Sequence, residues 1–244
     1  MNEQQIIQEL PAADRSEVKQ HLGKWQPPKV NLHKLPPGSI VVATGEQPRF
    51  NAFWACIIRT LRTYPQVDLK WAASVDICYN WNDAIRRRDT IGEWIWTIGD
   101  DHTWDVNIIE RLWGHNREVI VPLVLKRSFP HTPVIYDVNH AQAMPAPAQA
   151  GLREVWAAGG AGMLIRESAL ARIPPPWFEF MSENNERAGE DLMFCRKLRE
   201  AGIRIWCDLD AWMGHITPVE IWPIRNEQGQ WGTQYRNVLK ADVL

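Results

Sequence analysis

The chain has 244 residues, with 27 Lys and Arg against 29 Asp and Glu, so it suits one domain with short appendages and its formal net charge is only −2. This balance, without a block of basic residues, argues against nucleic-acid binding. Apolar runs such as residues 119–125 are too short to span a bilayer and the first twenty residues are polar, so we expect no transmembrane segment, no signal peptide and a cytoplasmic location.

The N-terminal region is predicted to be an extension that precedes the core. Residues 2–22 carry an apolar stripe typical of a helix, and the prolines that follow, up to Pro36 and Pro37, interrupt it. We therefore predict a helical extension and Pro-rich linker at 1–38, a core domain at 39–217 and a polar, Trp-containing tail at 218–244.

Within the core, strand and helix patterns alternate. The predicted strands are 39–45, 69–75, 94–98 and 119–125, and the predicted helices are 50–63, 81–88 and 106–115. Residues 128–151 lack periodicity and are expected to form a long loop or a short hairpin over the site. A glycine-rich turn then enters a strand at 156–165, and helices at 167–173 and 190–201 and a strand at 203–207 follow. Such alternation predicts an α/β fold with a mostly parallel central sheet flanked by helices.

Three clusters of polar residues lie near predicted element ends. Asp100, Asp101 and His102 follow the strand at 94–98, the pair Glu190–Asp191 opens a helix, and His215 follows a short strand pattern. Carboxylate oxygens and imidazole nitrogens can hold a divalent cation against a phosphate. Together the clusters predict a metal-dependent transferase that acts on a nucleotide-activated donor.

The order of the motifs resembles a known family. The segments VVATG, WIWTIGDDHTWD, WAAGGAGMLIRESAL, GEDLMFCRKLREAG and WMGHI are similar to those of glycosyltransferases of the GT-A fold, family 2 in particular, over residues 39–217. The resemblance implies a Rossmann-like nucleotide-binding half, a DxD-type metal motif, a glycine-rich acceptor loop and an acidic residue on the next helix. It further implies transfer of a sugar from a nucleotide-diphosphate donor to a sugar or other hydroxyl acceptor. Mn²⁺ is favoured over Mg²⁺ because an imidazole is among the ligands.

The register of the metal motif has two assignments, because Gly99 stands where relatives often have an aspartate. In the first, which we prefer, Asp101 is the principal ligand and Asp100 faces the donor ribose or a metal-bound water. In the second, Asp100 and His102 form a DxH pair similar to that of some GalNAc transferases. In either case His215 resembles the C-terminal histidine that completes the metal site in many GT-A enzymes.

The catalytic prediction concerns the helix that begins at Glu190. By resemblance, Asp191 is the general base that takes the proton of the acceptor hydroxyl in an inverting displacement, and Glu190 orients the acceptor. The alternative is that both acids only favour the positive end of the helix dipole as first-turn residues.

Further residues are assigned to the two substrates. Thr44, Gly45 and Asp76 resemble positions that contact the base and ribose, and Asn82 and Arg86 are expected to reach the nucleotide or diphosphate, although Arg86 also fits a solvated basic cluster.

For the acceptor, Gly159 and Gly160 belong to the glycine-rich turn, where a backbone can approach a ligand closely. Trp156 and Trp177 are candidates for stacking against a sugar ring, with core packing as the alternative for each.

Three other functions stay open at this point. A retaining glycosyltransferase or a nucleotidyltransferase uses the same metal and phosphate chemistry, although ATGEQPRF is a poor basic glycine-rich loop for the latter. A non-catalytic carbohydrate-binding relative would account for the missing carboxylate at Gly99.

Overall fold

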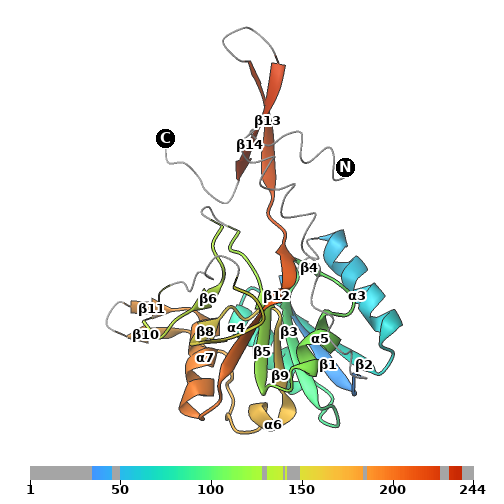
Figure 1. The fold of residues 1–244 in the computed structure, drawn as a ribbon, viewed down its shortest axis with the longest axis vertical. Helices are drawn as coiled ribbons and strands as arrows, with labels where there is room; N and C mark the ends of the chain where they lie inside the picture. Colours follow the sequence, from blue (N-terminus) through green and yellow to red (C-terminus); the bar gives the residue numbers. More distant parts are fainter. Residues whose placement is uncertain are drawn as a thin grey trace. The chain divides into compact units, whose positions relative to one another are not determined.

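The computed structural model describes residues 35–45, 50–127, 131–139, 141, 149–183, 186–225 and 231–237, with side chains described outside 181–188 and 219–237 (Figure 1). All of these residues belong to one unit, Asn31–Leu244. The helix predicted at 2–22 lies outside the described residues.

A central sheet organises this unit. Its order in the described part of the chain is β2-β1-β3-β9-β5-β12-β4, with β7 also paired to β12. The strands are β1 (Gly38–Thr44), β2 (Val67–Ala73), β3 (Trp94–Gly99), β4 (His102–Trp104), β5 (Val119–Leu123), β7 (Leu152–Val155), β9 (Met163–Arg166) and β12 (Ile205–His215). β1 is parallel to β2 and β3, β5 is parallel to β12, and β9 is antiparallel to both β3 and β5. Hence β1, β2, β3, β5 and β12 all run in one direction, and the predicted mostly parallel sheet is confirmed.

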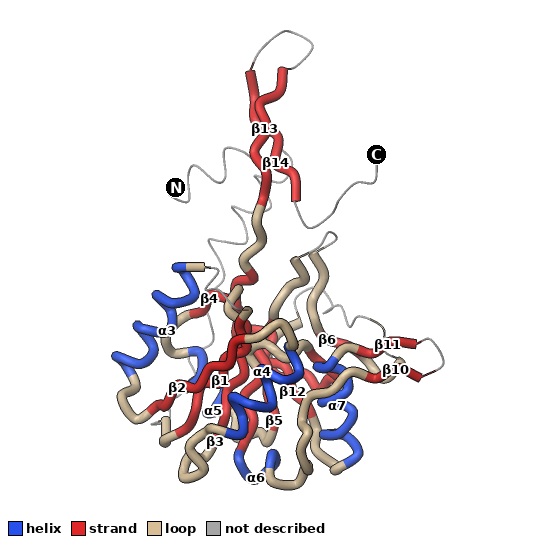
Figure 2. The backbone as a smooth tube through the Cα atoms, turned by 180° about the vertical axis from the view of Figure 1, so that it is seen from behind, coloured by secondary structure: helices blue, strands red, loops and turns tan. Residues whose placement is uncertain are grey.

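Helices cover both faces of the sheet (Figures 1 and 2). α3 (Asn51–Thr63) and α5 (Ile108–Gly114) pack on one face, and α4 (Ile77–Arg86), α6 (Glu167–Leu170) and α7 (Glu190–Glu200) pack on the other. Successive residues of β1 therefore alternate between two cores: Ile40 and Val42 join the first, and Val41 and Ala43 join the second. Burial on both faces explains why this strand is an unbroken apolar run.

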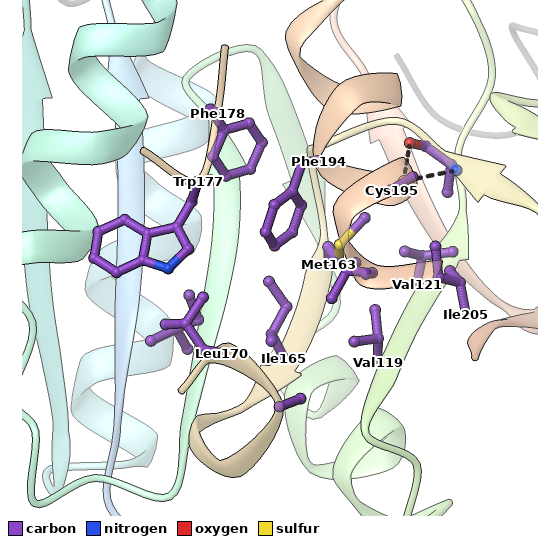
Figure 3. Close-up of a cluster of buried hydrophobic side chains, with 14 of the residues drawn as sticks. Val119, Val121, Met163, Ile165, Leu170, Trp177, Phe178, Phe194, Cys195 and Ile205 are labelled. Atoms are coloured by element: carbon purple, nitrogen blue, oxygen red, sulfur yellow. Dashed lines mark hydrogen bonds between the residues drawn. The ribbon is translucent and has the colours of Figure 1, made fainter. Parts of the chain in front are cut away.

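The core beneath α7 contains several aromatic side chains (Figure 3). The rings of Phe178 and Phe194 stack with centroids 4.5 Å apart. Trp177 packs in the same cluster, and its indole Nε1 donates a hydrogen bond to the carbonyl of Ile173 at 3.1 Å. The sulfur of Cys195 accepts from the amide of Ala158 at 3.5 Å and donates to its carbonyl at 3.4 Å, which links α7 to the backbone just before the glycine-rich turn.

The helices α3, α5 and α7 and the strands β1, β2, β3 and β5 match the predicted elements within a few residues. α6 ends at Leu170 rather than at 173, and β12 continues to His215 rather than ending at 207. α4 begins earlier than expected. It starts at Ile77 rather than near residue 81, because the Asp76 carboxylate accepts the backbone N–H of Tyr79 and caps the helix. The C-terminal end of α7 matches the prediction, with Gly202 in the left-handed region at φ +74°.

Several short strands were not predicted. β4 directly follows the acidic pair. β6 (Ile135–Tyr136) lies within the segment predicted as a loop or short hairpin, and it pairs with β8 (Ala157–Ala158) outside that segment. β10 (Met181–Glu183) pairs with β11 (Glu186–Ala188), and β13 (Val219–Arg225) pairs with β14 (Trp231–Asn237) in the segment expected to be a tail.

The domain boundaries at 38 and 217 stay a prediction. Among the described residues, no helix combines the length and apolar character needed to cross a membrane.

Candidate functional site

The site lies at the carboxyl ends of the sheet strands, near a reversal of strand order. The chain leaves β1 for β2 on one side and returns to β3 on the other, and open α/β sheets bind ligands beyond the strand ends at such a point. Thr44 ends β1 and Asp100 follows β3. Both are buried, and the Thr44 hydroxyl donates to the Asp100 carboxylate at 2.9 Å. Two residues predicted on the donor side therefore lie together, and Gly45, whose carbonyl also accepts from this hydroxyl at 3.0 Å, lies beside them.

A cavity of about 300 Å³ contains the predicted metal and catalytic residues. Its lining includes Asp101, His102, His215, Glu190, Asp191, Gly159 and Gly160, together with Arg127 and the apolar side chains of Ile77, Trp81, Val121 and Val124. A volume of this size is at the lower end of the range for small-molecule sites. The strand end, the helix start and the glycine-rich turn thus meet in one space.

Three of these side chains form a cluster of potential metal ligands. One ligand atom from each of Asp101, His102 and His215 lies within 4.8 Å of the other two. Asp101 Oδ1 is 2.8 Å from His102 Nδ1, and its Oδ2 is 3.4 Å from His215 Nε2. One carboxylate and two imidazoles are a donor set that fits a divalent transition-metal ion such as Mn²⁺.

Strand pairing brings the two histidines together. β4 and β12 are antiparallel, and His102 lies directly opposite His215 in their register. Side chains of opposed residues leave the same side of a sheet, and here the two rings stack with centroids 4.3 Å apart and an interplanar angle of 21°. The backbone N–H of Ile216 also donates to the Asp101 carbonyl at 2.7 Å. Strand pairing therefore places the two imidazoles side by side, and the hydrogen bond from Ile216 holds the Asp101 backbone beside them.

A hydrogen bond to a backbone carbonyl fixes the orientation of the His215 ring. Its Nδ1 is 2.8 Å from the carbonyl oxygen of Leu125, so Nδ1 carries the proton and donates, while Nε2 faces Asp101. A backbone carbonyl in this position is a common support for a metal-binding histidine. The chemistry of the cluster thus fits a cation ligated by Nε2.

The electrostatics of Asp101 favour its ionised form. Burial by itself raises the pKa of this carboxyl, but hydrogen bonds from His102 and His215 and their positive charge when protonated outweigh burial and lower the pKa below its ordinary value. Asp101 is therefore an anion throughout the neutral range, as a metal ligand must be.

Asp191 occupies the first turn of α7 and faces the glycine-rich turn. Its Oδ1 accepts the backbone N–H of Leu192 at 2.8 Å. A Cβ at Gly160 would lie 3.5 Å from the Asp191 Cβ, and one at Gly159 would lie 3.8 Å from its Oδ2 and 2.9 Å from Val134. The absence of side chains at these glycines lets the backbone approach the carboxylate closely.

Burial raises the pKa of Asp191 above that of an ordinary aspartate, although backbone N–H groups, including those of Leu192 and Gly160, oppose the shift. Burial and the neighbouring charge of Asp191 also raise the pKa of Glu190. A carboxylate with a raised pKa is a stronger proton acceptor once ionised, which suits a general base.

Two residues predicted on the donor side lie at the ends of α4. Asp76 caps the helix at the end whose first residue, Ile77, lines the cavity. Arg86 is at the opposite end, where its side chain is 62% exposed and lies 3.9 Å from Asp83. At about 1.5 Å per residue the helix separates the two ends by roughly 13 Å. Arg86 is accordingly not brought to the described cavity, and its placement matches the solvated basic cluster.

Asn82 and the two tryptophans are also outside the cavity lining. The Asn82 amide donates to the Phe178 carbonyl at 2.7 Å, and its oxygen accepts the Trp177 N–H at 2.7 Å. Asn82 thus fixes the backbone that carries Trp177, whose ring packs in the core. Trp156 is partly buried against that core, and its carbonyl accepts from Arg199 at 3.2 Å. Both tryptophans therefore pack in or against the core, which was the alternative to stacking against a sugar ring.

Arg127 is a cavity residue that sequence reasoning missed. Its Nη1 lies 3.0 Å from Asp101 Oδ2. The signal in the sequence was a basic pair, Lys126 and Arg127, just after a buried strand and at the ligand-binding end of the sheet. That signal has meaning only once the strand direction is known.

These features define an α/β fold with a mostly parallel central sheet flanked by helices, as predicted from the sequence. The similar solved structures include GT-A-type glycosyltransferases. "A197 from STIV" matches with a TM-score of 0.51 and 12% identity over 84% of this chain and 97% of that chain. GalNAc-T7 with UDP, GalNAc and Mn²⁺ matches with a TM-score of 0.48 and 10% identity over 75% of this chain and 44% of that chain. The catalytic domain of Drosophila beta1,4galactosyltransferase 7 in complex with xylobiose matches with a TM-score of 0.43 and 12% identity over 84% and 95%.

No protein-family model and no curated protein matches the sequence. At identities of 10 to 12% the structural likeness concerns the fold, so the activity is argued from the site.

Proposed function

We propose that this chain is a metal-dependent, inverting glycosyltransferase that moves a sugar from a nucleotide-diphosphate donor to a hydroxyl acceptor. The observation that carries the proposal is the single cavity that holds both the Asp101, His102 and His215 cluster and the Glu190 and Asp191 pair. A cation site and a base within one cavity are the two parts that such a transfer needs.

In this proposal Asp101, His102 and His215 hold Mn²⁺, with Mg²⁺ as the alternative ion. The bound ion would neutralise the charge that develops on the departing diphosphate. Of the two registers considered, the geometry supports the one with Asp101 as the principal ligand, because Asp100 is turned toward Thr44 and is absent from the described ligand cluster. Asp100, Thr44 and Gly45 then form the donor side of the site.

Asp191 would act as the general base. As the acceptor oxygen forms its bond to the anomeric carbon, the bond from that carbon to the diphosphate oxygen breaks and its electron pair leaves with the phosphate. The acceptor proton passes to the Asp191 carboxylate. Attack on the face opposite the leaving group inverts the anomeric configuration. Glu190 would orient the acceptor, and the turn at Gly159 and Gly160 would let it approach.

The test has two stages. A thermal-shift screen of UDP, GDP, CDP and dTDP with and without Mn²⁺ identifies the nucleotide, and release of that nucleoside diphosphate from its sugar conjugates then measures turnover. Asp191→Asn should lower turnover by roughly 10²- to 10⁴-fold while nucleotide binding is retained. Asp105→Asn, an exposed aspartate after β4, is the matched control and should leave turnover unchanged. Wild-type turnover by Asp191→Asn would remove it as the base.

The product distinguishes the alternatives. An inverted anomer supports the proposal, whereas a retained anomer indicates the retaining mechanism. A carbohydrate-binding relative without catalysis would bind nucleotide or sugar and release no nucleoside diphosphate.

A further inference from the structure

Arg127 and His215 contact the same carboxylate oxygen of Asp101, the principal ligand of the proposed metal site. The Arg127 guanidinium Nη1 is 3.0 Å from Asp101 Oδ2, and His215 Nε2 is 3.4 Å from the same oxygen. The Arg127 side chain lines the cavity and is 33% exposed, whereas that of Asp101 is 8% exposed. A permanently charged guanidinium therefore contacts the carboxylate that would ligate the cation in the proposed function.

The segment that carries Arg127 is anchored close to the site. After β5, the backbone amide of Val134 donates to the carbonyl of Val124 at 2.9 Å, and that of Lys126 donates to the carbonyl of Thr132 at 2.9 Å. The carbonyl of Leu125 in this same segment orients His215. The backbone up to Lys126 is thus held in place, and the long side chain of Arg127 is the part that can change its partner.

A divalent cation and a guanidinium compete for one carboxylate oxygen, since their like charges repel at such short range. A guanidinium is always charged and matches the geometry of a phosphate with two parallel N–H groups. When a cation holds Asp101, a diphosphate in the cavity is the anion best suited to receive Arg127.

We infer that Arg127 is a donor-diphosphate-binding residue that pairs with Asp101 when the cation is absent and transfers to the diphosphate when cation and donor bind together. The inference rests on the proposed function, because it assumes that Asp101, His102 and His215 form a cation site. The inference predicts that removal of the Arg127 guanidinium strengthens the binding of the cation and weakens the binding of the diphosphate.

The test uses the full chain with Mn²⁺ and inorganic pyrophosphate as probes, which avoids any assumption about the nucleotide base. Titration calorimetry measures the Kd for Mn²⁺ alone and the Kd for pyrophosphate at saturating Mn²⁺. Arg127→Gln should bind Mn²⁺ several-fold more tightly because the competitor is removed. It should bind pyrophosphate roughly tenfold to a hundredfold more weakly, as expected for loss of hydrogen bonds to a charged group.

Two variants control for charge and shape. Lys126→Gln removes one positive charge from the neighbouring position and should change neither Kd by more than about twofold, as expected for a screened charge without a direct contact. Arg127→Lys keeps the charge but loses the planar fork, and should bind pyrophosphate with an intermediate Kd.

The outcomes separate the inference from the proposed function. If wild type binds Mn²⁺ and Arg127→Gln binds both probes as wild type does, the inference is wrong and the metal site stands. Weaker binding of both probes would also overturn it, because Arg127 would then support the ligand cluster. If wild type binds pyrophosphate through Arg127 but binds no Mn²⁺, the metal dependence in the proposed function fails while the phosphate-binding role of Arg127 is supported.

Discussion

Asp208→Asn should destabilise the fold through loss of a buried charge network. Asp208 lies on β12, the strand that ends at His215, and it is fully buried. Its Oδ2 is 2.7 Å from Arg111 Nε and 2.8 Å from His115 Nε2, and its Oδ1 accepts the backbone N–H of Asp210 at 3.0 Å. The network joins β12 to the α5 region, so it supports the strand that positions a proposed metal ligand.

The size of the effect follows from the pKa of Asp208. Burial opposes ionisation, but the hydrogen bonds and charges of His115 and Arg111 lower the pKa from 3.8 to about 2. At about 1.4 kcal/mol per pKa unit, the charged form contributes roughly 2.5 kcal/mol to the free energy of unfolding. For a domain of this size, that loss corresponds to a Tm lower by roughly 5 to 10 °C.

The contribution of Asp208 to the free energy of unfolding should depend on pH. The folded-state pKa of Asp208 lies below its ordinary value, so its contribution is fully present above about pH 4 and is lost as the pH falls toward 2. Urea unfolding at pH 7 should show the full difference between wild type and Asp208→Asn, and at pH 3 the difference should be clearly smaller.

Glu200→Gln is the control, because the exposed pair of Glu200 and Arg196, with Oε1 and Nε 2.8 Å apart, should contribute less than about 0.5 kcal/mol. An Asp208→Asn difference that is absent at pH 7, or equal at both pH values, would refute the charge-based reasoning.

Three further predictions concern the site and its frame. His215→Ala should weaken Mn²⁺ binding by more than about tenfold, measured by calorimetry, and an unchanged Kd would remove it from the site. Gly162→Ala should lower the free energy of unfolding by about 2 kcal/mol or more, because the glycine has φ +82° and a Cβ there would lie 2.8 Å from the Met213 sulfur. Gly202→Ala is the control: Gly202 has φ +74° but no atom within 4 Å of an added Cβ, so the loss should be smaller. Urea unfolding measures both losses, and equal losses would contradict this reasoning. Because burial raises the pKa of Asp191, kcat/KM should increase with pH through a value above 3.8, and an acidic limb at or below 3.8 would argue against this base.

Most of the helices and strands could be predicted from the sequence because their causes are local. The apolar run at β1 requires burial on both faces, the stripe of Phe53, Cys56 and Ile57 requires one covered face of α3, and Gly202 ends α7 through its own backbone conformation. The start of α4 was predicted late because the side chain of Asp76, rather than the apolar pattern, decides where that helix begins.

The candidate site was predictable only in part. The sequence by itself determined which residue types follow each strand, and parallel strands bring their carboxyl ends to one edge, so Thr44 and Asp100 could be expected near each other. Asp191 opens a helix, and only the order of the motifs placed it at the same site. The sequence did not determine which side chains point into the cavity. Trp177 and Asn82 were predicted at the site, yet Trp177 packs in the core and Asn82 accepts the Trp177 N–H there.

The tertiary structure alone decided the partners of the charged groups. The pairing of β4 with β12 places His102 opposite His215, and the segment after β5 brings Arg127 to Asp101. Asp100 accepts the Thr44 hydroxyl and is absent from the described ligand cluster. Hydrophobic periodicity reports which face of an element is buried. Strand register and the contacts between distant segments depend on how the whole sheet is assembled, and no local pattern contains that information.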